Sequence, residues 1–258
     1  MLMSGLPKKE KVIALLKSIE TGDPTPANSY IRKDSYKQHN LSIPDGFEGF
    51  AGMLNSLSPG ETKVNIVRAF IDGDYVFTHT EYTLAGHKVG FDIFKFKDEK
   101  IVEHWDNLQD FAENSVSGRS QVDGPTTAVD VEKTSENKAL VQGFVDDVLL
   151  GKNSGKLKDY VVLENYLQHN PDIADGFSSV IKTLERFAAE GTPLVYKRHH
   201  MLLGEGNFVL SVSDGEFLNK SASFYDLFRV EDGKIVEHWD TIEMMPNKTE
   251  WKHSNGKY

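Results

Sequence analysis

The chain contains two copies of one sequence pattern. Residues 100–106, Lys-Ile-Val-Glu-His-Trp-Asp, recur without change at 234–240. Further upstream, Tyr-Lys-Gln-His-Asn at 36–40 corresponds to Tyr-Leu-Gln-His-Asn at 166–170. Because matches that keep their order and nearly constant spacing are the signature of a duplicated structural unit, the sequence predicts a tandem pair of similar domains.

A third match and a change in composition give the expected domain boundaries. Asp-Gly-Phe at 45–47 recurs at 175–177, in the same order relative to the other matches. The stretch between the copies is rich in Ser, Thr, Gly, Asp and Val and carries no helical or strand period, which is typical of a linker. We expect copy one at residues 1–112, a linker at 113–135 and copy two at 136–258.

Charge and cysteine content exclude several classes of function. The chain has a formal net charge of -10 at pH 7, and its acidic residues are scattered. Nucleic-acid binding requires a clustered basic surface, so we expect no nucleic-acid partner. The 258 residues include no cysteine, which excludes disulfides, thiolate nucleophiles and cysteine-based zinc sites.

The N-terminal region has only a short apolar stretch. It runs from Val12 to Leu16 and is bounded by Lys11 and Lys17. A signal peptide has a longer apolar region, and a membrane-spanning helix needs a longer one still. We therefore expect a cytoplasmic protein that has no membrane partner.

Each copy begins with a stretch of helical periodicity. Residues 8–20 place apolar side chains at helical spacing, and residues 136–150 are their counterpart in copy two. A short helical segment should then lead into the Tyr-x-Gln-His-Asn motif. After the Asp-Gly-Phe turn, further helices are expected at 47–57 and 177–189.

The pattern then changes from helices to strands. Turn sequences such as Asp72-Gly-Asp74 and Asp98-Glu99 suit tight hairpins between β-rich stretches. In copy one the strands are expected at 63–70, 75–84, 88–97 and 101–108. Helices followed by a meander predict an α+β fold: two tandem cone-shaped domains, each a curved antiparallel sheet capped by its N-terminal helices and enclosing a cavity.

Strand alternation brings polar side chains together at the end of copy one. Because successive residues of a strand point to opposite faces, His104 and Asp106 share one face and Trp105 lies on the other. On the preceding strand Asp92 shares a face with Phe94. A short hairpin joins the two strands, so Asp92 should lie near His104 or Asp106.

Copy two repeats the same set with Asp226, His238 and Asp240. Burying such a group is costly unless its members have partners. Two interpretations stay open: a His–Asp hydrogen bond that only holds two strands together, or the polar wall of a ligand pocket. Recurrence does not choose between them, because duplication preserves structural residues as well.

The Tyr-x-Gln-His-Asn motif could add ligand-binding residues from the helical side. Its Tyr could instead be a core aromatic residue with one partner for its hydroxyl, and its His could cap backbone groups. The candidate ligand-binding residues from the motif are Tyr36, His39 and Asn40 in copy one and Tyr166, His169 and Asn170 in copy two.

Taken together, these motifs resemble one family. The Tyr-x-Gln-His-Asn motif, the Asp-Gly-Phe turn that opens a helix and the strand pair ending in Lys-Ile-Val-Glu-His-Trp-Asp are similar to SnoaL-like polyketide cyclase domains. Those domains belong to the nuclear transport factor two-like (NTF2-like) superfamily. The resemblance covers nearly all of both copies outside the linker, and it implies the same cone of curved sheet and helices.

The resemblance also implies a chemistry. The better-understood members of the family carry out intramolecular aldol condensation without metal or cofactor, using an Asp of the final strand region as general base. By position that Asp is Asp106 in copy one and Asp240 in copy two, with His104 and His238 beside them. We accordingly expect no cofactor and no metal.

A second carboxylate, Asp92 in copy one and Asp226 in copy two, stands next to the implied base. It could raise the pKa of that base, or it could repel a negatively charged enolate. We list both residues as candidate ligand-binding residues of the pocket.

The predicted function is a small-molecule enzyme that removes a proton next to a carbonyl on an apolar or aromatic ligand, as aldol cyclases and isomerases do. A non-catalytic binding protein of the same fold is one alternative. A scaffold is another, in which the fused copies form an intramolecular pseudo-dimer that could also form homo-oligomers. The His and Asp side chains could also form a metal-ligand set.

Overall fold

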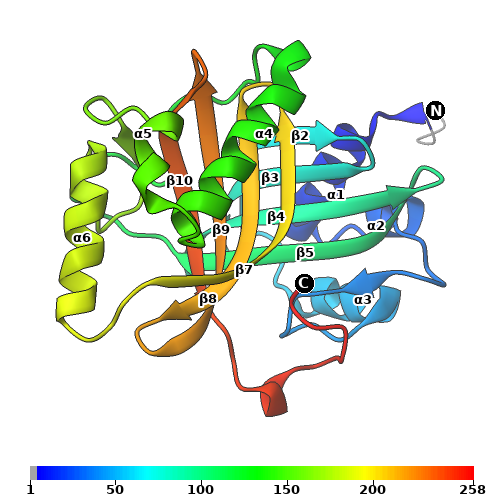
Figure 1. The fold of residues 1–258 in the computed structure, drawn as a ribbon. Coiled ribbons are helices and arrows are strands. Elements are labelled where there is room, and N and C mark those ends of the chain that lie inside the picture. Colours follow the sequence, from blue (N-terminus) through cyan, green and yellow to red (C-terminus); the bar gives the residue numbers. More distant parts are fainter. Residues whose placement is uncertain (1–4) are drawn as a thin grey trace. The chain divides into compact units, whose positions relative to one another are not determined.

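A computed structural model of the chain describes residues 5–258 (Figure 1). The chain forms two compact units. Unit 1 comprises the residues up to Asp110 together with Pro246–Tyr258, and unit 2 comprises Phe111–Met245. Each unit contains one copy of the repeat, with its own sheet of five strands.

The boundaries of the units differ from the expected boundaries at 112 and 135. The segment that follows copy one, residues 111–130, belongs to unit 2, and the segment that follows copy two, residues 246–258, belongs to unit 1. We call these segments the first arm and the second arm. The expected linker is therefore largely an arm that packs within unit 2.

Within the described residues, unit 1 has three α-helices and five strands, and the strands follow the order β1-β5-β4-β3-β2 in the sheet. Figure 1 shows β2 to β5 side by side. The elements of this unit are α1 (Lys8–Thr21), α2 (Thr25–Tyr30), β1 (Lys37–Gln38), α3 (Gly46–Ser56), β2 (Lys63–Asp72), β3 (Tyr75–Thr83), β4 (His87–Lys97) and β5 (Lys100–Asp110), and the second arm adds a single 3-10 turn, η5 (Lys248–Glu250).

Helix α1 shows why the helices cover one face of the sheet. Its residues Val12, Leu15 and Ile19 recur at helical spacing and are all buried, so they form one apolar stripe. The helix ends at Gly22, whose φ of 72° is left-handed and whose N–H donates to the carbonyl oxygen of Ser18. The stripe packs in one core with apolar residues of the sheet and of the other two helices.

Unit 2 repeats this arrangement, with strand order β6-β10-β9-β8-β7. Helices α4 and α5 (green in Figure 1) lie against the sheet of β7 to β10. The elements are η2 (Val131–Lys133), α4 (Thr134–Phe144), the π-helical turn η3 (Val145–Leu149), η4 (Ser154–Lys156), α5 (Leu157–Tyr160), β6 (Leu167–Gln168), α6 (Phe177–Ala189), β7 (Val195–Glu205), β8 (Phe208–Phe217), β9 (Lys220–Glu231) and β10 (Lys234–Met244).

The expected α+β fold is the observed one, with one addition. The helices of both copies and the four long antiparallel strands of copy one lie close to their expected positions. The short strands β1 and β6, which lie in the Tyr-x-Gln-His-Asn motif, were not expected. They pair in parallel with the last strand of their sheet, so that Gln38 lies beside His104 and Gln168 beside His238.

The hairpin between β4 and β5 turns at Asp98 and Glu99, which both have positive φ angles, 48° and 63°. Two successive residues in this region are typical of a tight hairpin turn that matches the twist of the strands. A bulge between Lys95 and Phe96 shifts the register just after this turn. Bulges bend strands, and this bend helps to curve the sheet around the core.

None of the helices in residues 5–258 is long and apolar enough to cross a membrane.

Candidate functional site

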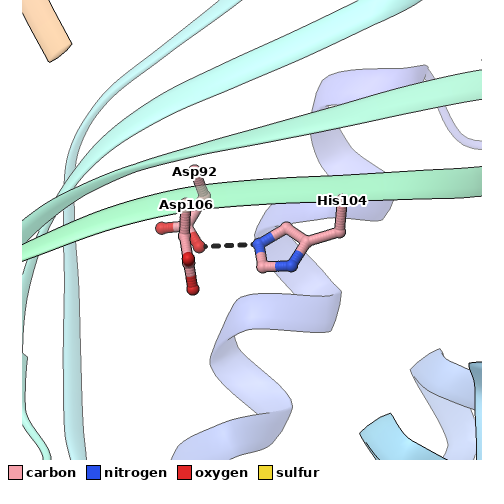
Figure 2. A group of neighbouring side chains, drawn as sticks. All are labelled: Asp92, His104 and Asp106. Atoms are coloured by element: carbon pink, nitrogen blue, oxygen red, sulfur yellow. Dashed lines mark hydrogen bonds and ion pairs between the residues drawn. The ribbon is translucent and has the colours of Figure 1, made fainter. Parts of the chain in front are cut away.

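The expected polar group forms in both units because the strands pair in one register. Asp92 on β4 lies directly opposite Asp106 on β5, and Phe94 lies opposite His104. Figure 2 shows the two carboxylates side by side and the ring of His104 directed toward Asp92. In this group, which we call the unit 1 triad, the three side chains are all buried.

Unit 2 has the equivalent group, which we call the unit 2 triad. Asp226 on β9 lies opposite Asp240 on β10, and His238 stands two residues before Asp240. The His238 Nε2 atom is 2.9 Å from Asp226 Oδ1, and the corresponding distance from His104 Nε2 to Asp92 Oδ1 is 3.0 Å. The hydrogen bonds within the two triads therefore agree closely.

An Asn of the Tyr-x-Gln-His-Asn motif holds the second Asp of each triad. Asn40 donates from Nδ2 to Oδ2 of Asp106 at 2.6 Å, and Asn170 donates to Asp240 at 2.7 Å. The structure thus brings both expected Asn residues to the site. Each leaves the other oxygen of its Asp, Oδ1, buried and without a hydrogen-bond partner in the described part of the chain.

The Gln of the motif is a site residue that the sequence reasoning did not name. Oε1 of Gln168 accepts the backbone N–H of Asn170 at 2.9 Å and lies 2.9 Å from Nδ1 of His238. Because that oxygen can only accept, Nδ1 must carry the hydrogen. Gln38 fixes His104 in the same way, at 2.9 Å. The Gln recurs at the same place in both motifs, and this recurrence was the signal that could have identified it as a site residue.

This hydrogen bonding determines where a proton must lie. With Nδ1–H donated to Gln168, the Nε2 atom of His238 faces a carboxylate oxygen of Asp226, so one proton must lie between them. Burial disfavours the charged imidazolium, but the hydrogen bond with Asp226 and the charges of Asp240 and Asp226 outweigh it. The pKa of His238 is raised as a result.

Asp240 has the ionisation that a general base needs. Burial raises its pKa, and the charge of Asp226 adds to this effect. The charge of His238 and the hydrogen bond from Asn170 act in the opposite direction, and the pKa is about 6. A carboxyl group with this pKa is largely ionised at neutral pH yet remains a stronger base than an exposed Asp.

A tyrosine also donates to the first Asp of each triad, but from different strands. In unit 1, Tyr82 on β3 donates to Asp92 at 2.5 Å. In unit 2, Tyr196 on β7 donates to Asp226 at 3.0 Å. In unit 1 the tyrosine is on β3, and its partner across the strands is Val64 on β2. In the equivalent pair of unit 2 the tyrosine is on β7 instead, and its partner on β8 is Gly215. The comparison of the two copies missed these residues because they do not align.

The motif tyrosines lie in the same interior. Tyr36 is buried, and its hydroxyl accepts a hydrogen bond from Gln38 at 3.3 Å. Tyr166 lines the pocket of unit 2. Burial, reinforced by the charges of Asp226 and Asp240, raises the pKa of Tyr166 well above its usual value. Its hydroxyl stays protonated at neutral pH and can donate a hydrogen bond.

The motif histidines do not join the triads. His39 stacks on Trp105 with ring centroids 4.8 Å apart, and its Nε2 atom lies 2.9 Å from Glu103. Trp105 and Glu103 alternate with the triad residues along β5, so they belong to the opposite face of the sheet. His39 was expected among the ligand-binding residues, but it lies on the face of the sheet opposite the triad.

His169 follows the same pattern in unit 2. It stacks on Trp239 at 4.6 Å and lies 2.8 Å from Glu237. It is not among the residues that line the pocket of its unit. Both histidines lie on the outer face of their sheet and contact an arm. They point away from the triads because successive side chains of the extended motif alternate between the two faces.

Unit 2 contains a cavity of about 430 Å³ over its triad. This volume is suited to a small organic ligand. The wall is mostly apolar, with polar groups gathered at one part of it. The polar residues that line it include Tyr166, Gln168, Asn170, Asp226, His238 and Asp240, and the apolar ones include Phe144, Phe177, Phe228 and Ile242.

Each triad also brings three donor atoms within 4.8 Å of one another, close enough to hold a metal ion in principle. The Nε2 atom of each His, however, is already hydrogen-bonded to the first Asp of its triad. A metal ion would have to displace the proton of that bond. We therefore interpret the triads as groups that share a proton rather than as metal sites.

Comparison with known proteins gives similar folds and no family assignment. No protein-family model matches the chain, and no curated protein matches it. A candidate ketosteroid isomerase from Kribbella flavida is 13% identical with a TM-score of 0.37, covering 45% of this chain and 83% of that one. A candidate polyketide cyclase from Acidithiobacillus ferrooxidans is 15% identical with a TM-score of 0.35, covering 42% and 92%.

An NTF2-like protein of unknown function from Cytophaga hutchinsonii is 9% identical with a TM-score of 0.36, covering 42% of this chain and 95% of that one. Each of these three solved structures therefore spans less than half of the present chain and most of its own.

Proposed function

We propose that unit 2 binds a small apolar carbonyl compound and that Asp240 removes a proton from the carbon next to the carbonyl. The observation that carries this proposal is the state of Asp240. It is a buried carboxyl group on the wall of a largely apolar cavity, its pKa is about 6, and its Oδ1 atom has no hydrogen-bond partner in residues 5–258.

The proposed step is a proton transfer at carbon. The Asp240 carboxylate takes the proton, the electron pair of the C–H bond forms a carbon–carbon double bond, and the carbonyl electron pair moves to oxygen. The product is an enolate, with the proton on Asp240. Return of that proton to another carbon of a conjugated ligand gives isomerisation, whereas attack of the enolate carbon on a second carbonyl gives an aldol ring closure.

The enolate oxygen needs a hydrogen-bond donor that stays protonated. Tyr166 supplies one, because it lines the cavity and its raised pKa keeps the hydroxyl neutral. A donor in a buried, apolar site stabilises a developing oxyanion more strongly than it would in water. We assign Tyr166 this role and Asp240 the role of base.

The second carboxylate favours this chemistry more than it opposes it. Asp226 shares a proton with His238 and accepts a hydrogen bond from Tyr196, so its charge is largely balanced within the site. Its remaining effect on Asp240 is to raise the pKa. Of the two effects expected from the sequence, support for the base therefore outweighs repulsion of the enolate.

Hydrogen–deuterium exchange at carbon tests the proposal directly. Proton NMR in deuterated buffer would follow a panel of cyclic and aromatic ketones with the wild type, with Asp240→Asn and with the Asp106→Asn/Asp240→Asn double variant. Exchange that Asp240→Asn removes supports the proposal, and exchange that survives in the double variant contradicts it. Ligand line broadening without exchange in any protein would favour the binding-protein alternative.

A further inference from the structure

The two arms occupy equivalent positions on the units that hold them. In unit 1 the N–H of Lys252 donates to the carbonyl oxygen of Leu41 at 2.9 Å, and in unit 2 the N–H of Val116 donates to that of Pro171 at 2.9 Å. Both acceptors directly follow the Tyr-x-Gln-His-Asn motif of their unit. The arms are therefore part of the repeat, although each lies in the unit of the other copy.

A second pair of contacts gives the same alignment. Nδ1 of His39 is 2.9 Å from the carbonyl oxygen of Gly256, and Nδ1 of His169 is 2.7 Å from that of Ser120. The two pairs of contacts have the same spacing along the two arms. This fixes the correspondence of the arms residue by residue.

The next residue along each arm differs in charge. In unit 1 it is Lys257, which is 2% exposed and whose Nζ atom is 3.6 Å from Oδ1 of Asp106. In unit 2 it is Gln121, which is also 2% exposed and whose Oε1 atom accepts the backbone N–H of Ala112. A buried ammonium thus faces the triad of unit 1, and a neutral amide holds the equivalent position in unit 2.

We propose that this one position decides which copy holds the working general base: Lys257 balances the second negative charge of the unit 1 triad, whereas Gln121 supplies no charge at the equivalent position of unit 2. The assignment of the working base rests on the proposed function, but the charge balance does not. The hydrogen bonds that the motif Gln and Asn make with the two triads are alike.

The remaining charged and titratable groups around the triads support the same difference. Asp172 faces Asp240 and raises its pKa further, whereas Ser42 stands at the equivalent position of copy one. The groups that face Asp106 are Asp92, His104, Tyr36, Tyr82 and Lys257. Those that face Asp240 are Asp226, His238, Asp172, Tyr166 and Tyr196.

The test is a reciprocal exchange of the two residues in the full chain, read by carbon-13 NMR of the Asp side-chain carboxyl groups. Gln121→Lys should move the titration of the Asp240 carboxyl from about 6 to lower pH by about 1 to 3 units, as expected for a carboxylate next to a cation. Gln121→Met, which adds no charge, is the matched control. A folded Gln121→Lys variant with an unchanged Asp240 titration would overturn the proposal.

Lys257→Gln tests the same idea from the other side and does not require a new buried charge. In urea unfolding at pH 8 it should lower the stability of unit 1, and it should do so much less in an Asp106→Asn background, where the carboxylate that Lys257 faces is gone. Lys257→Arg, which keeps the charge, should lower the stability less than Lys257→Gln. No change in Lys257→Gln would also overturn the proposal. Neither of these measurements depends on turnover. Absence of hydrogen–deuterium exchange in the ketones would therefore contradict only the proposed function.

Discussion

In units 1 and 2 the same Gln and Asn hold two triads of the same composition. Gln38 and Gln168 accept from the ring Nδ1 atoms, and each His shares a proton with the first Asp of its triad. Unit 1 adds a buried ammonium, and unit 2 adds a further carboxylate. The comparison teaches that duplication conserved the hydrogen-bond framework, while the charged residues around it differ between the two units.

The largest expected difference between the units lies in catalysis. Asp240→Asn should lower the rate of hydrogen–deuterium exchange next to the ketone carbonyl by about 10²- to 10⁴-fold, the usual contribution of a general base. Asp106→Asn should lower it much less, because its carboxylate is balanced by Lys257. The rates come from the deuterium-exchange assay. Equal losses in the two single variants would break the comparison and assign the chemistry to both copies.

Equivalent substitutions on the outer faces of the two sheets should reduce the free energy of unfolding by different amounts. Glu237 is buried between His169 and Arg229, at 2.8 Å and 2.7 Å, so Glu237→Gln leaves the guanidinium of Arg229 without this negatively charged partner and should cost about 3 kcal/mol. Glu103 is less buried, so Glu103→Gln should cost about 1 kcal/mol or less. Urea unfolding at neutral pH measures both variants.

The effect of Glu237→Gln on stability should also depend on pH. Burial opposes ionisation of Glu237, but the hydrogen bonds from His169 and Arg229 outweigh it and lower its pKa. A lowered pKa stabilises the folded protein above the unfolded pKa, and this stabilisation is lost as the pH falls through the folded value. The difference between wild type and Glu237→Gln should therefore shrink in acid, and a constant difference would argue against the ion pair.

Asp240 should show the opposite dependence of stability on pH. Its folded pKa of about 6 lies above its ordinary value of 3.8, so ionisation costs folding free energy as the pH rises from 4 to 7. Asp240→Asn should stabilise unit 2 at pH 8 by on the order of 3 kcal/mol, and by far less at pH 4. The urea midpoint of the transition of unit 2, measured at both values, tests this.

Asp106→Asn provides the matched comparison. It removes a negatively charged partner of a buried lysine, so it should lower the stability of unit 1 at pH 8, where Asp240→Asn raises that of unit 2. If both substitutions change stability in the same direction, the charge difference between the triads is not what distinguishes the units.

The smallest expected effect concerns the oxygen donor. Tyr166→Phe should lower the exchange rate by about 10- to 100-fold, somewhat less than the loss of a fully committed oxyanion donor. Tyr36→Phe is the control in unit 1, where the hydroxyl accepts from Gln38, and it should change the rate less. A Tyr166→Phe variant with full activity would remove Tyr166 from the mechanism.

The sequence by itself determined the duplication, the helices and long strands, and the meeting of His104 with Asp92 and of His238 with Asp226. These depend on local periods of 3.6 and 2 residues and on short hairpins, and neighbouring residues contain that information. The position of His39 was missed for a local reason too. The motif forms a short strand, so its alternation sends Gln38 and Asn40 to the triad and His39 to the other face.

Only the tertiary structure decided the rest. Tyr82 and Tyr196 reach equivalent carboxylates from different strands, and the second arm brings Lys257 to the unit 1 triad from far away in the sequence. The ionisation of Asp240 depends on burial and on charges from several elements at once. Electrostatic energies depend on distance in space rather than along the chain, and the sequence pattern does not contain those distances.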